Sequence, residues 1–246
     1  MDFGTLLLIF VAVGIGATIK GATGMGMPLI AIPTMASVVG LQHALAIMVA
    51  PVLVSNIWQV WRLRKARHDS PLGFLVPMLV ACCIGVVIGT YFLTTIPERG
   101  LTFALGLLLV GYMIFRLARP TFILGPEAAR AWAIPAGLST GVLHGATGIA
   151  APTGVTFVHA MRFGRDAHVF AVSAMFLMLA VTQTPSLWVA GLLKPQWALE
   201  SLFAVIPTFA LMPLGQWLGQ KLSQQAFDRM ILGFLGVIGV KMLLGI

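Results

Sequence analysis

The chain has 246 residues, of which 59% are hydrophobic and only 9% are charged. Soluble domains carry about 25% charged residues, because polar groups must cover their surface. The composition therefore excludes an ordinary soluble protein, a disordered chain and a coiled coil, and it predicts an all-α polytopic membrane protein. The net charge of +8 comes from basic residues in short loops between apolar runs. This pattern favours orientation in a lipid bilayer over nucleic-acid binding.

Ten apolar segments follow one another along the chain. They cover about 4–19, 27–39, 43–61, 72–93, 100–117, 131–143, 151–161, 168–190, 196–219 and 227–245. A helix needs about 20 residues to cross the hydrocarbon core. Segments 27–39, 131–143 and 151–161 are too short, since at 1.5 Å per residue they extend over only about 17–20 Å. Short segments at corresponding positions indicate the binding site of a transporter.

An internal duplication relates the two halves of the chain. Lys20–Pro28 reads Lys-Gly-Ala-Thr-Gly-Met-Gly-Met-Pro, and 124 residues later His144–Pro152 reads His-Gly-Ala-Thr-Gly-Ile-Ala-Ala-Pro. Further pairs in the same order are Gln59 with Gln183, Pro71 with Pro195 and, after a six-residue insertion, Pro77 with Pro207 and Glu98-Arg99 with Asp228-Arg229. We therefore predict a first transmembrane repeat over 1–123 and a second over 124–246, within one integral membrane domain.

The basic residues orient the helices. The loop Arg62–Arg67 has the densest positive charge, so we place it in the cytoplasm. If 131–161 is a hairpin that enters and leaves on one side, most basic residues lie inside, against Arg99 and Lys194 outside. Each repeat is then a re-entrant or short helical hairpin plus three transmembrane helices, an odd number of crossings. The repeats therefore have inverted topology, which places a substrate site between them near the midplane.

Each hairpin tip combines Gly-Ala-Thr-Gly with a proline four residues later. Glycine allows positive φ and close approach of a ligand, and proline suits the first turn of the next helix. We expect the second arms to begin near Met27-Pro28 and Ala151-Pro152, with free N–H groups and positive dipole ends directed at the tips. Two such ends at one cavity form an anion site. The alternative is that the glycines only allow close helix packing.

The candidate substrate-binding residues are the tips, the residues before them and two repeat-related amides. Lys20 faces an anion or snorkels to the outer interface. His144 donates a hydrogen bond, carries a proton or is a neutral histidine bonded to a carbonyl. The amides line the site or hold helices together, and the threonine hydroxyls add donors. The full set is Lys20, Gly21, Thr23, Gly24, Met25, Gly26, Gln59, His144, Gly145, Thr147, Gly148, Ile149 and Gln183.

Other polar residues lie near segment ends, where a solvated interfacial role is favoured over proton relay. They are His43, His159, Asp166 and His168. Most tryptophans also lie near segment ends, which is typical of an aromatic belt. The sequence has no P-loop, metal-ligand cluster or nucleophile–base motif. We therefore expect no catalytic residue, no metal, no cofactor and no enzymatic activity.

The sequence resembles the sulfite exporter TauE/SafE family of bacterial membrane proteins. The resemblance rests on chain size, the duplicated architecture, and Gly21–Pro28 with its looser copy at Gly145–Pro152. The second copy departs from the family pattern at Ala150-Ala151. The resemblance implies secondary transport, usually export, of sulfite, sulfoacetate, related organosulfonates or small carboxylates.

These observations predict a bacterial inner-membrane exporter of a small sulfur-containing anion that works by alternating access. Moving one negative charge out of an inside-negative cell is favourable by about 2.3 kcal/mol per 100 mV, so uniport needs no coupling ion. Proton coupling through His144 is the alternative. The rival functions are a channel or transporter for another small anion or carboxylate, and a non-transporting assembly protein. The expected partners are the anion and the bilayer, without nucleic acid, and the sequence leaves a homodimer open.

Overall fold

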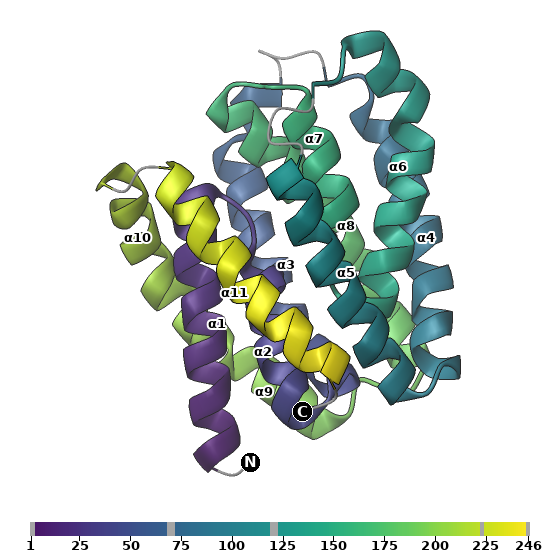
Figure 1. Cartoon of the computed structure of the whole chain (residues 1–246), viewed down its shortest axis with the longest axis vertical. Coiled ribbons are helices and arrows are strands. Elements are labelled where there is room, and N and C mark those ends of the chain that lie inside the picture. Colours follow the sequence, from purple (N-terminus) through teal and green to yellow (C-terminus); the bar gives the residue numbers. More distant parts are fainter. Residues whose placement is uncertain (1–2, 68–71, 119–122, 222–223, 245–246) are drawn as a thin grey trace. The chain divides into compact units, whose positions relative to one another are not determined.

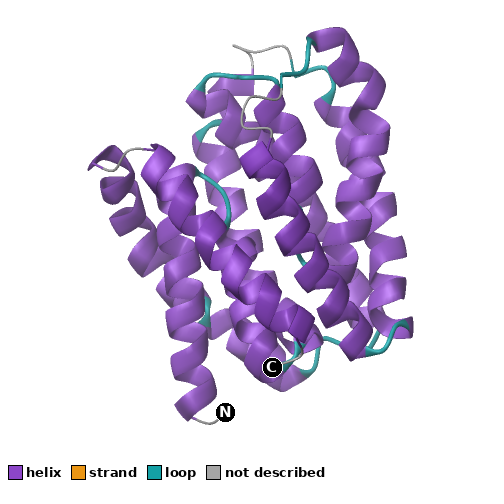
Figure 2. Cartoon of the chain, viewed as in Figure 1, coloured by secondary structure: helices purple, strands orange, loops and turns teal. Residues whose placement is uncertain are grey.

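The computed structural model describes residues 3–67, 72–118, 123–221 and 224–244. Every regular element in these ranges is a helix (Figure 1 and Figure 2). Six of the described helices are long and apolar enough to cross a membrane. The prediction of an all-α polytopic membrane protein is therefore confirmed.

The helices follow the predicted segments closely. The first half contains α1 (Phe3–Thr23), α2 (Met27–Val39), α3 (Leu41–Arg62), the 3₁₀ turn η1 (Arg64–Arg67), α4 (Leu75–Thr95) and α5 (Glu98–Ala118). The second half contains α6 (Pro126–Thr147), the π-helical turn η2 (Ala151–Val155), α7 (Thr156–Ala160), α8 (Arg165–Val189), α9 (Pro195–Phe203), α10 (Val205–Lys221) and α11 (Gln224–Leu244).

The helix predicted at 131–143 is longer than expected. α6 has 22 residues, which correspond to about 33 Å at 1.5 Å per residue. The predicted length of this arm is therefore wrong, although α6 is not among the six described helices that are both long and apolar enough to cross a membrane. The polar side chains of Glu127 and Arg130 interrupt the apolar pattern in the first turns, while Pro126 starts the helix and alanines continue it. α2, with 13 residues, and the η2–α7 run are short, as predicted.

The segment predicted at 196–219 is divided between α9 and α10 at Ala204. Pro207 has no N–H to donate to the carbonyl of Phe203, which removes a helical hydrogen bond at this point. α10 begins 130 residues after α4, which is the repeat shift beyond the insertion. α9 therefore occupies the region that the second repeat has gained.

The chain divides into two compact units, and each unit takes helices from both predicted repeats. Unit 1 contains Met1–Met48, Ile96–Pro120 and Lys194–Ile246, and unit 2 contains Val49–Thr95 and Thr121–Leu193. In unit 1, α1 packs along α10 and α5 packs along α11, and in unit 2 α4 packs along α6. In both units the first helix of one repeat thus contacts the second of the three predicted crossings of the other. The opposite orientation of the repeats stays a prediction.

Glycines bring the paired helices into backbone contact. In unit 2, a methyl group added to Gly145 of α6 would overlap the backbone of α4 at Val86 and Gly89. In unit 1, a methyl group on Gly21 of α1 would overlap the backbone of α10 at Met212. Small residues have this packing role in membrane helices. The first glycine of each tip, Gly21 or Gly145, therefore allows close helix packing, which was the alternative to ligand approach.

Candidate functional site

The first hairpin tip is a left-handed turn between α1 and α2. Its glycines at 24 and 26 have φ of 80° and 95°, a conformation that other residues rarely adopt. Gly26 is the N-cap of α2, Pro28 lies in the first turn, and no side chain caps the helix. The predicted start near Met27-Pro28 is confirmed. Pro28 has no N–H and the N–H of Leu29 donates to the carbonyl of Gly26 at 3.1 Å, so the N–H of Met27 is the first-turn donor of α2 left for a ligand within unit 1.

The second hairpin tip repeats only part of this turn. Gly148 has φ of 74° and its N–H bonds to the carbonyl of His144, as Gly24 does to Lys20. Ala150, however, has φ of −107°, because an alanine avoids the left-handed conformation of Gly26. The second arm starts at Ala151 as predicted, but its first turn is π-helical. The two tips therefore present their helix ends differently.

The tip threonines bond to the backbone in the same way. The Thr23 hydroxyl lies 2.7 Å from the carbonyl oxygen of Met25 and 2.9 Å from that of Ile19, and the N–H of Met25 donates to it at 3.3 Å. The Thr147 hydroxyl donates to Leu143 at 2.6 Å and accepts the N–H of Ile149 at 3.3 Å. Both hydroxyls therefore close their turns. A hydrogen bond from either hydroxyl to a substrate would require it to leave a carbonyl.

Lys20 and His144 are buried immediately before the tips. Lys20 is 2% exposed and His144 is 3% exposed. A lysine that snorkels to the interface would keep its ammonium group in water, so the burial of Lys20 favours the alternative in which it faces an anion. The His144 ring meets the edge of Phe176 at 6.1 Å. Its Nδ1 atom is buried and has no hydrogen-bond partner.

Both candidate glutamines are buried in unit 2. The Ser173 hydroxyl of α8 donates to Gln59 Oε1 of α3 at 3.0 Å. Gln183 Nε2 lies 3.4 Å from the carbonyl oxygen of His144, directly before the second tip. Gln183 is thus placed beside a predicted tip, while Gln59 joins two helices. The first tip lies in unit 1 and the second tip in unit 2, so a shared cavity stays a prediction.

One functional candidate was missed by the sequence analysis. Glu200 lies in a predicted span, is 0% exposed and bonds to His43, whose side chain is 14% exposed. His43 is half-buried, so its expected solvated interfacial role stays a prediction, while its ring also pairs with a buried carboxylate. An acidic residue inside an apolar segment is a signal for function, and this signal was present in the sequence. His159 and Asp166 are exposed, as expected near segment ends.

The cationic and metal-binding chemistry of the described residues is limited. No group of three or more His, Cys, Asp or Glu side chains within them is arranged to hold a metal ion. The exposed tryptophans include Trp61, Trp132, Trp188 and Trp217.

The tips offer a buried cationic side chain (Lys20), an imidazole (His144) and helix ends. This chemistry suits an anion.

A family model described as "Sulfite exporter TauE/SafE" matches residues 8–242. The chain belongs to this family. The match covers both hairpin tips and all described helices at least in part, which confirms the resemblance inferred from the tip sequences. Comparison with curated proteins and with solved structures found no match. Membership of TauE/SafE, together with six apolar helices, makes this protein a sulfite-exporter-type membrane transporter.

Proposed function

We propose that this TauE/SafE protein exports a small sulfur-containing anion, such as sulfite or sulfoacetate, across the bacterial inner membrane by alternating access. The observation that carries the proposal is the repeated tip, where Lys20 or His144 is buried directly before a broken helix. At the first tip, the helix that follows has an uncapped N-terminus. A sulfonate or sulfite group brings negative charge and several acceptor oxygens to these groups.

Electrostatics favour an anion over a neutral solute at these tips. A buried ammonium group loses several kcal/mol of hydration, which a bound anion offsets only through close contact. The positive end of α2 adds to this attraction. Binding is followed by outward movement, which an inside-negative potential favours by about 2.3 kcal/mol per 100 mV for one negative charge.

The proposal is tested in liposomes that contain the purified protein. Vesicles are loaded with sulfite or sulfoacetate, and efflux is measured under potassium diffusion potentials of either sign. We expect saturable efflux of at least one of the two, faster when the inside is negative, together with exchange of labelled substrate. If both anions leave no faster than from protein-free vesicles, the substrate class is wrong. Acetate in the same assay tests the rival that the substrate is a simple carboxylate.

A lysine pair gives a matched control for the site. Lys20→Met removes the buried charge at the first tip, and Lys241→Met removes an exposed charge in α11. Loss of a hydrogen bond to a charged group is worth about 1.5–3 kcal/mol, so we expect Lys20→Met to weaken substrate affinity about 10–100-fold. Lys241→Met should transport normally. Equal activity of both variants, at equal protein yield, would remove Lys20 from the site.

A further inference from the structure

A buried histidine–glutamate pair in unit 1 has no role in the proposed anion site. Glu200 of α9 bonds through Oε2 to His43 Nε2 of α3. Its other oxygen, Oε1, lies 3.4 Å from Gln196 Nε2. Among the described residues, His43 and Glu200 form the one pair of ionisable side chains within salt-bridge distance. A fully buried carboxylate with one titratable partner is an unusual arrangement in a membrane protein.

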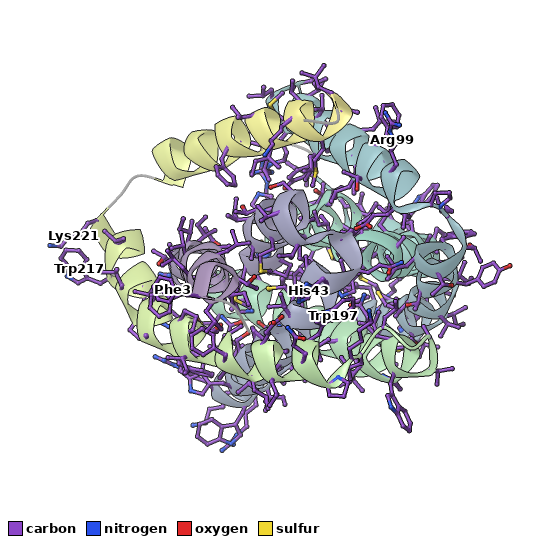
Figure 3. All side chains as sticks on the ribbon, turned by 90° about the horizontal axis from the view of Figure 1, so that it is seen from below. Phe3, His43, Arg99, Trp197, Trp217 and Lys221 are labelled. Atoms are coloured by element: carbon purple, nitrogen blue, oxygen red, sulfur yellow. The ribbon has the colours of Figure 1, made fainter. Side chains whose placement is uncertain are left out.

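Two elements position His43: α9 contacts its imidazole, and α5 fixes the start of its helix. The ring of Trp197 stacks on His43 with centroids 4.4 Å apart and planes 16° from parallel. Figure 3 labels the two residues, which lie close to each other. Glu98 of α5 accepts the N–H of Leu41 at 2.8 Å, which fixes the start of α3 two residues before His43. A methyl group on Gly40, which has φ of 87°, would overlap the Glu98 carboxylate. The side chain of His43 is therefore anchored.

Few other charged groups of unit 1 lie on the elements around the pair. Glu98 stands at the start of α3, and Lys194 Nζ lies 4.4 Å from the centroid of the Trp197 ring. α2 has no ionisable side chain, and α10 has only Lys221 at its end. α1 contributes the buried Lys20.

The residue types make this pair suited to exchange a proton. A permanently charged arginine is the usual partner of a buried carboxylate with a structural role. Imidazole instead changes its charge between pH 5 and 8. An isolated buried carboxylate is unfavourable, so Glu200 is suited to a partner that can carry a proton. The side chain of His43 is 14% exposed and that of Glu200 is fully buried, so the imidazole is the member of the pair that reaches the surface.

We propose that His43 and Glu200 form the proton-coupling site of this transporter, where one proton bound from the outer side moves inward as one anion leaves. The outer side follows from the predicted topology, in which the Arg62 end of α3 is cytoplasmic and Lys194 is outside. The claim that an anion leaves rests on the proposed function. The proton itself binds reversibly to nitrogen or carboxylate oxygen, and no other bond changes.

A transport experiment tests the coupling. Proteoliposomes contain equal sulfoacetate on both sides, the interior is one pH unit above the exterior, and valinomycin with equal potassium holds the potential at zero. One-to-one exchange of proton for anion predicts that internal sulfoacetate falls about tenfold below the external concentration. A channel or an uncoupled uniporter leaves the two concentrations equal. Glu200→Gln and His43→Gln should abolish the depletion and keep exchange of labelled sulfoacetate.

Glu127→Gln is the matched control, because Glu127 is an exposed acid at the start of α6. This variant should deplete internal sulfoacetate as the wild type does. The proposal is overturned if the wild type exchanges sulfoacetate without depletion, or if Glu200→Gln still depletes it. If Glu200→Gln does not fold, His43→Gln gives the same decision.

Infrared difference spectroscopy tests the proton site without any substrate. Between pH 5 and 8, purified wild-type protein should show a carboxylic acid C=O band that Glu127→Gln keeps and Glu200→Gln loses. His43→Gln should move the pH at which this band appears. If neither sulfite nor sulfoacetate is transported but the band is present, the proposed export function is refuted and the proton site is retained. If the band is unchanged in folded Glu200→Gln, the proton site is refuted.

Discussion

The two hairpin tips share four consecutive residues, yet the helical turn that follows each tip has a different conformation. At the first tip, Gly24 and Gly26 both have positive φ and an α-helix follows. At the second, Gly148 alone has positive φ and the next turn is π-helical. The shared Gly-Ala-Thr-Gly thus builds the same turn twice, while the following spacer decides how the next helix presents its N-terminus. This difference favours the first tip as the stronger anion contact.

The largest expected effect concerns the feature that the tips share, their packing glycines. Gly21→Ala and Gly145→Ala each place a methyl group against the backbone of a neighbouring helix. Because backbone cannot move as a side chain does, each variant should lose about 3 kcal/mol of folding free energy. Folded yield and resistance to unfolding by SDS measure the loss. Gly111→Ala is the control, since nothing lies within 4 Å of its added methyl group. Normal stability of Gly145→Ala would contradict the contact.

A smaller effect on stability is expected from substituting the tip threonines Thr23 and Thr147, whose hydroxyls both bond to the backbone of their turns. Thr23→Val and Thr147→Val each leave one tip N–H and one carbonyl without the hydroxyl. Each should lower the free energy of unfolding by about 1 kcal/mol, whereas serine at either position should restore it. Thr34→Val, which removes a hydroxyl bonded within α2, is the control for sulfoacetate efflux. A variant that abolishes efflux at unchanged stability would show instead that its hydroxyl binds substrate.

Exchange of one methyl group at the spacers tests where the tips differ. Gly26→Ala puts a side chain at φ of 95°, which should destabilise the protein by about 1–2 kcal/mol. Ala150→Gly, at the equivalent position, should change the stability by less than about 1 kcal/mol. Unfolding by SDS, followed by tryptophan fluorescence, compares the two. Equal effects would mean that the two spacers have the same conformation, against the structure.

Much of the architecture could be predicted from hydropathy and the internal repeat. The starts of both second arms at Met27 and Ala151 followed from glycine and proline preferences. The length of α6 was missed because Glu127 and Arg130 interrupt its apolar pattern without interrupting the helix. The packing role of Gly21 and Gly145 was open in the sequence, since close packing and ligand approach require the same absence of a side chain.

The His43–Glu200 pair could not be found by local pattern, because its members are separated by most of the chain. The position of His43 near a predicted segment end suggested solvent contact, and the acidic Glu200 within an apolar segment was overlooked. Only the packing of α3 with α9 within unit 1 joins them and buries the carboxylate. The insertion that carries Glu200 was visible in the repeat alignment, but nothing in the alignment showed which side chain it would meet.

By itself, the sequence determined the membrane class, the order of the helices, the duplicated turns and the family. These properties depend on composition and on residues close together in the chain, where hydrogen bonding and lipid solvation are local. The tertiary structure decided which helices pair, that the tip threonines bond to the backbone, and that a carboxylate is buried against His43. Those outcomes depend on contacts between distant segments, whose side-chain burial is decided only when the helices pack.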